Sequence, residues 1–281
     1  MSLWGEFVQR VAMGYGSGKC LKRWETIMDG TILVTGGTGI LGRQVIADLR
    51  RAGREVRNLA RSADGPYRGD LVTGQGVAQA AEGVGTVVHL ASKPPGKTDV
   101  QAARNLLKAL APGTHVVYIS IVGVDRHPYS YYQVKYAVEQ LVEASGLPYT
   151  ILRTTQFHDF MASLCRTVTR SPVVPVPLGW AAQPIAISEV SSQLTTLAMG
   201  DPAGRVADMG GPQVLGFREM AELYLAAEGK RKPIVELLVP GRVSKAFRAG
   251  YQLTPERAVG RITFQEFLRG GVPASSYFHK A

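Results

Sequence analysis

The 281-residue sequence contains only two cysteines, Cys20 and Cys165, and neither stands at a metal-ligand spacing from another cysteine or histidine. We therefore expect no disulfide framework and no bound metal. The sequence also lacks any apolar stretch near the roughly 18 residues of a membrane-spanning helix. Its N-terminus has no apolar segment followed by a small-residue cleavage site, as a signal peptide would. These absences favour a cytoplasmic protein with no membrane partner.

Acidic residues are scarce relative to basic ones, 22 against 32, and the formal net charge is +10. A basic surface favours anionic partners such as nucleotides, phosphates or nucleic acid. The basic residues are scattered, however, and the densest run is only Lys230–Lys232. Because no nucleic-acid-binding motif accompanies them, we expect a small-molecule partner rather than nucleic acid, and a solvated basic surface explains most of the charge.

The pattern divides the chain into three parts. Residues 1–28 are rich in glycine without periodicity, which predicts an N-terminal extension that is disordered or an upstream mis-start before Met28. Residues 29–170 predict a nucleotide-binding core. After a Pro-rich segment, residues 171–281 predict a mixed region that completes the sheet and forms a small substrate cap. The pattern leaves open whether the protein is a monomer or a homodimer.

Short apolar runs alternate with amphipathic stretches from residue 30 onward. Strands are predicted at 31–35, 55–60, 86–91, 115–121 and 149–153, and helices at 41–52, 100–110 and 131–145. Later elements are a helix at 188–199, a strand at 205–209 and a helix at 217–229. Near-continuous Val, Ile and Leu in the strands indicates burial on both faces. The alternation predicts an α/β fold, a Rossmann-like doubly wound parallel sheet.

The sharpest motif lies between the first strand and the first helix. Gly36, Gly39 and Gly42 follow the apolar run 31–35 and open the amphipathic stretch 41–52. Glycines permit a tight turn and close approach of the backbone to a ligand, and a helix N-terminus offers free amides to a pyrophosphate. Strand, triad and helix together predict a dinucleotide site.

The segment TGGTGILGR, together with later segments, resembles the short-chain dehydrogenase/reductase superfamily, most strongly its atypical NmrA-like branch. The resemblance covers nearly all of residues 28–270. It implies NAD(P) binding by the glycine loop, by an Asp–hydrophobic pair near adenine, by the end of the third strand, and by the start of the loop after the fifth. The implied contacts are Gly36, Thr38, Gly39, Ile40, Leu41, Gly42, Asp70, Leu71, Leu90, Ala91, Ser92 and Thr155.

The end of the second predicted strand bears on the choice of cofactor. An NAD site places a carboxylate there to bind the ribose 2′-hydroxyl group. This chain has Arg61 instead, with no Asp or Glu beside it, and Arg43 follows the glycine loop. A guanidinium binds a 2′-phosphate that a carboxylate would repel. The sequence therefore favours NADP over NAD, although both arginines also fit a solvated surface.

Tyr131 and Lys135 form a YxxxK pair at the start of the third predicted helix, where positions i and i+4 share one face. A nearby ammonium group lowers the pKa of a phenol, which would let Tyr131 exchange a proton with a substrate. The resemblance implies that Lys135 also binds the nicotinamide ribose. The alternative is an aromatic cluster with a purely structural role.

The third residue implied by the resemblance is a serine at the end of the fourth strand. Ser120 is the nearest match, but the usual serine doublet is replaced by Ser120-Ile121, and Ser130 is an outside substitute. Two histidines lie in or near the predicted strand ends. His89 fits the core better than catalysis, and His158 fits a substrate-facing or a packing role equally well.

Two functions follow from these residues. The first is an NADP-dependent oxidoreductase that reduces a small carbonyl or quinone-like compound, with Tyr131, Lys135 and Ser120 as catalytic residues. The second is an NmrA-like redox-sensing protein that binds NADP with little or no turnover. The intact YxxxK pair favours the enzyme, and the altered serine favours the sensor.

Overall fold

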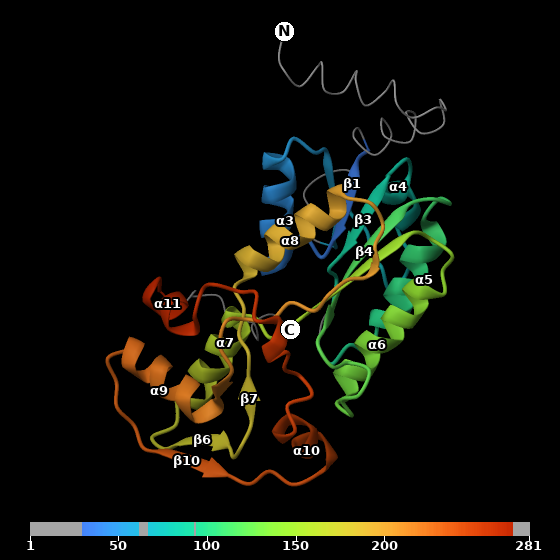
Figure 1. The fold of residues 1–281 in the computed structure, drawn as a ribbon. Helices are drawn as coiled ribbons and strands as arrows, with labels where there is room; N and C mark the ends of the chain where they lie inside the picture. Colours follow the sequence, from blue (N-terminus) through green and yellow to red (C-terminus); the bar gives the residue numbers. More distant parts are fainter. Residues whose placement is uncertain (1–29, 62–66, 93, 272–281) are drawn as a thin grey trace.

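A computed structural model describes residues 30–61, 67–92 and 94–271 (Figure 1). The expected N-terminal extension, 1–28, lies outside these residues. No helix within the described ranges has both the length and the apolar character needed to cross a membrane.

A six-stranded parallel sheet forms the centre of the fold, in the order β2-β1-β3-β4-β5-β8. Its strands are β1 (Ile32–Thr35), β2 (Val56–Leu59), β3 (Thr86–His89), β4 (His115–Ile121), β5 (Tyr149–Thr154) and β8 (Gly204–Arg205). Strand β2 pairs with one edge of β1 and β3 pairs with its other edge, so the direction in which strands are added to the sheet reverses at β1. Ligands of such sheets lie at the carboxyl ends of the strands where this reversal occurs. The Rossmann-like fold is therefore confirmed.

Helices cover both faces of the sheet (Figure 1). Helices α3 (Ile40–Arg51) and α8 (Ile187–Met199) pack on one face, and α4 (Val77–Ala81), α5 (Asp99–Ala109) and α6 (Ser130–Glu143) lie on the other. The apolar side chains of α3 and α8 meet those of the central strands in one buried cluster, which includes Val45, Val117, Val190 and Leu194. Burial on both faces accounts for the near-continuous apolar strands.

The predicted elements of the core are confirmed to within two residues at their ends, and β4 has the predicted bounds. The strand predicted at 205–209 is wrong in extent. Its regular pairing is limited to Gly204–Arg205, and Met209 joins β5 through one isolated bridge to Thr154. The amides of Val206 and Met209 donate to the carbonyls of Ile151 and Arg153. The two donors are three positions apart in this segment, whereas their acceptors are two positions apart in β5. The extra residue forms a bulge that interrupts the regular pairing.

The remaining elements form a second group of packed helices and short strands. Helices α7 (His158–Val168), α9 (Phe217–Ala227) and α11 (Phe264–Arg269) share a buried cluster, and β6 (Val174–Pro177) pairs with β10 (Ile234–Leu237). The short strands β7 (Ala181–Ala182) and β9 (Leu215–Gly216) pair with each other, and α10 (Arg242–Arg248) follows β10. The sequence prediction placed a loop where α7 begins.

Candidate functional site

The glycine loop joins β1 to α3 and fits closely against the end of β3. Gly36 has φ +73°, a conformation that side chains rarely adopt, and a Cβ atom there would lie 2.8 Å from the backbone nitrogen of Ala91. A Cβ atom on Gly42 would overlap the Gly36 carbonyl oxygen and lie 2.6 Å from Gly37 Cα. Both positions therefore require glycine, as the triad predicted.

The loop leaves the first-turn amides of α3 without a capping side chain. Gly39 is the N-cap, and no side chain accepts a hydrogen bond from the helix start. Thr38 and Gly39 are exposed, and Ile40 is half-buried. Leu41 is different, because its side chain lies in the core and only its backbone faces the helix start. This arrangement of free amides around a glycine turn fits the pyrophosphate of a dinucleotide.

Asn58 on β2 is a loop contact that the sequence reasoning missed. A Cβ atom on Gly37 would overlap the Oδ1 atom of Asn58, so the carboxamide lies directly against the glycine loop. This oxygen is buried and has no hydrogen-bond partner among the residues that the structure describes. An unpaired buried acceptor is costly, and a ribose hydroxyl group of a bound dinucleotide would satisfy it. The available signal was an uncharged polar residue, Asn58, inside a predicted strand.

Arg61 is exposed just beyond the end of β2, as the prediction of a phosphate contact requires. A second arginine lies beside it. Ala60 and Arg68 form an isolated bridge, and Arg68 Nε donates to the Arg61 carbonyl oxygen over 3.0 Å. The predicted Arg43 is exposed on the first turn of α3. Arg43, Arg61 and Arg68 are all exposed, and their contact with a cofactor stays a prediction.

The Asp70–Leu71 pair forms a tight turn. Asp70 Oδ1 accepts from the Val72 amide at 2.7 Å, and Asn105 Nδ2 donates to the Leu71 carbonyl oxygen at 2.8 Å. The Leu71 side chain packs on the cluster beneath α5. One oxygen of the Asp70 carboxylate is thus used by its own turn, and the contact of Asp70 with adenine stays a prediction.

Leu90, Ala91 and Ser92 follow β3 and lie beside the end of β1. The amides of Leu90 and Ala91 donate to the carbonyl and the hydroxyl group of Thr35. His89 is buried, and its Nδ1 lies 2.7 Å from Thr35 Oγ1. Burial lowers the pKa of His89 to about 3, so the ring is neutral. His89 is a core residue, as expected, and it fixes the two strand ends side by side.

Tyr131 lies on the first turn of α6, and its hydroxyl group is 2.8 Å from Ser92 Oγ. This contact joins the predicted proton donor to the end of β3. The pKa of Tyr131 is raised to about 12, chiefly by burial. The Ser92 hydroxyl group opposes this rise, and the negative charge of Asp99 adds to it. The expected lowering of the phenol pKa is therefore absent.

Lys135 does not contact the phenol that it was expected to tune. Its ammonium group donates to the Ile119 carbonyl oxygen at 2.7 Å and lies 4.3 Å from the centre of the Tyr118 ring. Within the described ranges, no hydrogen bond joins it to Tyr131. Burial lowers the pKa of Lys135 to about 8. Lys135 is buried in this structure, and its predicted contact with a nicotinamide ribose stays a prediction.

Ser120 and Thr155 are buried at the ends of β4 and β5. Ser120 Oγ has no hydrogen-bond partner, and no contact in the described part of the chain joins it to Tyr131. Thr155 Oγ1 donates to the Gln183 carbonyl oxygen at 2.5 Å and accepts from the Gly211 amide at 3.2 Å. Both bonds serve internal structure, so the structure supplies no contact that supports the predicted role of Thr155.

Aromatic side chains surround the start of α6. The His127 ring lies 4.8 Å from the Tyr132 ring and 4.4 Å from the Phe247 ring of α10, and Trp180 stacks on Phe247 at 4.3 Å. By contrast, His158 is fully buried among the rings of α11, and its Nε2 lies 2.9 Å from the Ile262 carbonyl oxygen. His158 is therefore a packing residue and does not face a substrate.

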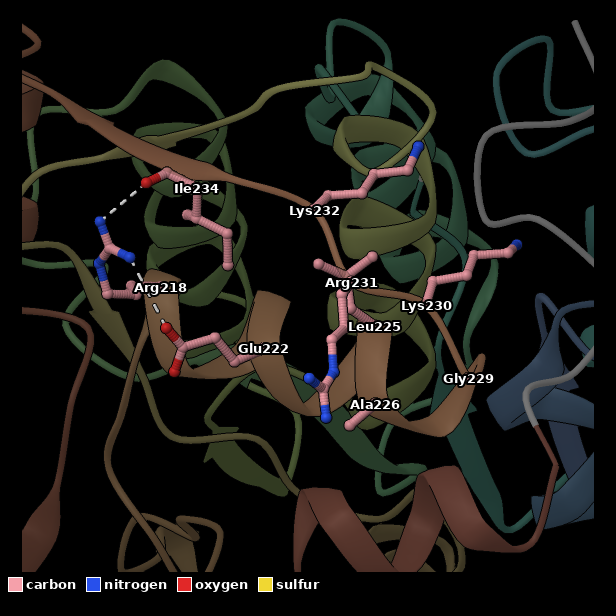
Figure 2. Close-up of a pocket in the computed structure, with 9 residues that line it drawn as sticks. All are labelled: Arg218, Glu222, Leu225, Ala226, Gly229, Lys230, Arg231, Lys232 and Ile234. Carbon is pink, nitrogen blue, oxygen red and sulfur yellow. Dashed lines mark hydrogen bonds and ion pairs between the residues drawn. The ribbon is translucent and has the colours of Figure 1, made fainter.

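A separate surface hollow lies between α9 and β10 (Figure 2). Its apolar floor is formed by Leu225, Ala226 and Ile234, and basic side chains rise around it. Arg218 is held by the Ile234 carbonyl oxygen and by Glu222. None of the hollow's lining residues belongs to the glycine loop or to the start of α6. The hollow is therefore no part of the candidate site. Within the described ranges, no cluster of three His, Cys, Asp or Glu residues could hold a metal ion.

Comparisons with known proteins agree with this geometry. Two curated relatives are each 25% identical to the chain. One is prestalk A differentiation protein A of Dictyostelium discoideum, aligned over 72% of this chain and 70% of the relative. The other is the chloroplastic protein High Chlorophyll Fluorescence Phenotype 244 of Arabidopsis thaliana, with 85% and 66% covered.

Solved structures share the fold at low identity. The NADPH-dependent quinone oxidoreductase of Escherichia coli, solved with NADPH, has a TM-score of 0.73 at 16% identity, with 85% of this chain and 99% of that chain covered. The UDP-glucose 4-epimerase of Thermus thermophilus, solved with NAD, has a TM-score of 0.61 at 19% identity, with 85% and 96% covered. The sequence model of the NAD(P)H-binding family matches residues 36–173, which span the glycine loop, the end of β3 and helix α6. Residues 36–173 of this chain thus match an NAD(P)H-binding family, and they lie within a Rossmann-like fold that NAD(P)-binding proteins of known structure share.

Proposed function

We propose that the protein is an NADP(H)-dependent oxidoreductase that reduces a small carbonyl or quinone-like compound. The observation that carries this proposal is the position of Tyr131. Its hydroxyl group meets Ser92 at the end of β3, and Ala91, next to Ser92, touches Gly36 of the glycine loop. A proton-donating phenol thus lies beside the edge of the sheet where a dinucleotide would bind.

Separate residues of the site would bind the pyrophosphate, bind a ribose and transfer the proton. Gly36, Gly42 and the free amides of α3 would hold the pyrophosphate, and Asn58 would face a ribose. A bound nicotinamide would supply the hydride. Tyr131 would hold and move the proton at the substrate oxygen.

Arg61 and Arg68 support the preference for NADP. The hydrogen bond from the Arg68 side chain to the Arg61 carbonyl oxygen keeps both residues beside the end of β2, where the 2′-phosphate of NADP would lie. Two guanidinium groups would stabilise that phosphate by charge-assisted hydrogen bonds. Among the described residues that end this strand, Leu59, Ala60 and Arg61, none is a carboxylate.

The aromatic residues around α6 support a flat apolar substrate. Tyr132, Phe247 and Trp180 place ring surfaces next to the helix turn that carries Tyr131. Such surfaces bind a planar quinone or enone by stacking. The E. coli neighbour is a quinone oxidoreductase, which agrees with this substrate class. A small-molecule partner, a monomeric or homodimeric state and a cytoplasmic setting belong to the same proposal.

A second candidate is a cofactor-binding protein without turnover. Ser120 has no contact with Tyr131, and Lys135 is turned to the Ile119 carbonyl oxygen. These two departures from the expected triad favour a sensor that reads the NADP(H) redox state. The relatives are named as a differentiation protein and as a protein defined by a chlorophyll fluorescence phenotype, and neither name states a reaction.

One experiment separates the candidates. Calorimetric titration with NADPH and NADH is followed by NADPH oxidation with a panel of quinones, enones and small carbonyls. The oxidoreductase proposal expects turnover, and Tyr131→Phe should lower kcat by about 100-fold or more, the usual contribution of general acid–base catalysis. Tyr136→Phe removes a phenol from the same helix and serves as the control. NADPH binding without turnover on any substrate would favour the sensor, and unchanged turnover in Tyr131→Phe would refute the proton-transfer role.

A further inference from the structure

We infer that Ser92 and Asp99 form a proton relay with Tyr131, in which Asp99 is the terminal proton acceptor or donor. The inference deepens the proposed oxidoreductase function and rests on it. Asp99 does not meet the substrate in this scheme. It is a positioning and relay residue that acts through Ser92 and Tyr131.

Two short hydrogen bonds define the relay. Ser92 Oγ donates to Asp99 Oδ2 at 2.5 Å, and Ser92 Oγ lies 2.8 Å from the Tyr131 hydroxyl oxygen. A serine hydroxyl group has a single hydrogen, and a carboxylate can only accept. Since the Ser92 hydrogen goes to Asp99, the Tyr131 hydrogen must go to Ser92. The chain of donors therefore runs from Tyr131 to Ser92 to Asp99.

This direction determines what Tyr131 can do. Its hydrogen points at Ser92, so its lone pairs are left to accept a hydrogen bond from a substrate hydroxyl group. When an alcohol is oxidised, its O–H bond breaks and the proton passes to the Tyr131 oxygen. The phenol proton then moves to Ser92, and the Ser92 proton moves to the Asp99 carboxylate. The nicotinamide cofactor is the oxidant, and carbonyl reduction reverses each proton step, beginning from protonated Asp99.

Asp99 is well placed to end the relay. It is the first residue of α5, where the helix dipole stabilises a carboxylate, and its side chain is buried. The turn before it also holds Tyr131, because a Cβ atom on Gly96 would lie 3.1 Å from the Tyr131 ring. Gly96, three residues before Asp99, therefore packs against the Tyr131 ring of α6.

Other ionisable groups near Tyr131 do not replace Asp99. Tyr129 and Tyr118 interact with it only through space, and both neighbours are phenols. Lys135 belongs to the same helix, but its ammonium group is committed to the Ile119 carbonyl oxygen. Lys135 and Glu139 face the buried side of α6. The only side-chain hydrogen bond of the Tyr131 hydroxyl group within the described ranges is the one to Ser92.

The test follows the Tyr131 phenol directly, in the cofactor-free protein and without a substrate. Protein with ¹³Cζ-labelled tyrosine is titrated by NMR, and Tyr131→Phe assigns the signal. We expect the Tyr131 signal to show a step at a pH far below that at which the phenol ionises, transmitted through the hydrogen bonds that join Tyr131 to Ser92 and Asp99. Asp99→Asn should abolish this acidic step and lower the phenol pKa, because the nearby negative charge is removed.

Ser92→Ala provides a second, independent route, because Ser92 is exposed and its loss does not disturb the core. This variant should also lose the acidic step. Thr98→Val is the matched control, since Thr98 is the exposed neighbour of Asp99 and makes no capping hydrogen bond. An acidic step that is missing in the wild type, or that persists in Ser92→Ala, would overturn the relay. A parallel NADPH titration keeps the two proposals apart: a relay signal without NADPH binding would refute only the oxidoreductase.

Discussion

Replacing Gly42 by alanine tests the central feature of the site, the close packing of the glycine loop. The new Cβ atom would lie 2.6 Å from Gly37 Cα and would overlap the Gly36 carbonyl oxygen. Carbon atoms pack at about 3.5–4.0 Å, so the loop must move by about 1 Å. Such a shift would break at least one amide–phosphate hydrogen bond, which contributes about 1.5–3 kcal/mol when one partner is charged. The Kd for NADPH should therefore rise by about 10-fold to 100-fold.

The direction in which the Tm of Gly42→Ala changes is a second test of the close packing around Gly42. Alanine inside a helix is better than glycine by about 1 kcal/mol, so helix propensity alone would stabilise the variant. Thermal unfolding followed by circular dichroism should nevertheless show a lower Tm, because the steric overlap outweighs that gain. Calorimetry then gives the loss of NADPH affinity separately.

Two further glycines complete a graded series. A Cβ atom on Gly39 would lie 3.3 Å from the Gly36 carbonyl oxygen, a tight contact that small shifts relieve. Gly216 precedes α9, has a negative φ, and meets nothing within 4 Å. We expect the loss of NADPH affinity to decrease from Gly42→Ala to Gly39→Ala, and to vanish in Gly216→Ala. Wild-type affinity and stability in Gly42→Ala would refute the reasoning that the loop is closed by backbone contact.

Two other predictions concern stability. Glu139→Gln should lower the free energy of unfolding, measured by urea denaturation, by about 3–5 kcal/mol, because Arg153 and Glu139 are both buried and paired at 2.6 Å. Glu222→Gln in the exposed pair Arg218–Glu222 is the control, and its loss should stay below about 1 kcal/mol. Desolvation lowers the pKa of the buried His158 from 6.5 to about 4. Between these two pH values the unfolded chain binds a proton at His158 that the folded chain does not. The stability that is present above pH 6.5 is therefore lost as the pH falls toward 4. His158→Gln should lose less stability than the wild type between pH 7 and 5, and an equal loss would contradict the assignment.

Much of the fold follows from local patterns in the sequence. The bounds of β4 were predicted because His115–Ile121 is a continuous run suited to a strand buried on both faces. The glycine loop was predicted because its spacing lies between a strand and a helix. The bulge beyond β8 was not predictable, since it depends on how Val206 and Met209 meet the β5 backbone, and no local residue marks it.

The site was predictable only where neighbours in the chain are neighbours in space. Tyr131 was found from YxxxK, but its real partner Ser92 lies 39 residues away and Asp99 follows a proline-containing turn. The expected pairing of Tyr131 with Lys135 failed because the long lysine side chain reached a carbonyl group of β4 instead. Such choices depend on which backbone groups are left without partners, and the sequence alone does not state this.

Helix α8 has a consequence for how the protein can be divided. The segment matched by the family model ends at residue 173, yet α8 begins at Ile187 and covers the same sheet face as α3. A fragment cut at residue 173 would leave Val45, Val117 and the rest of that cluster open to water. A shortened version of the protein should therefore retain α8, so that this face of the sheet stays covered.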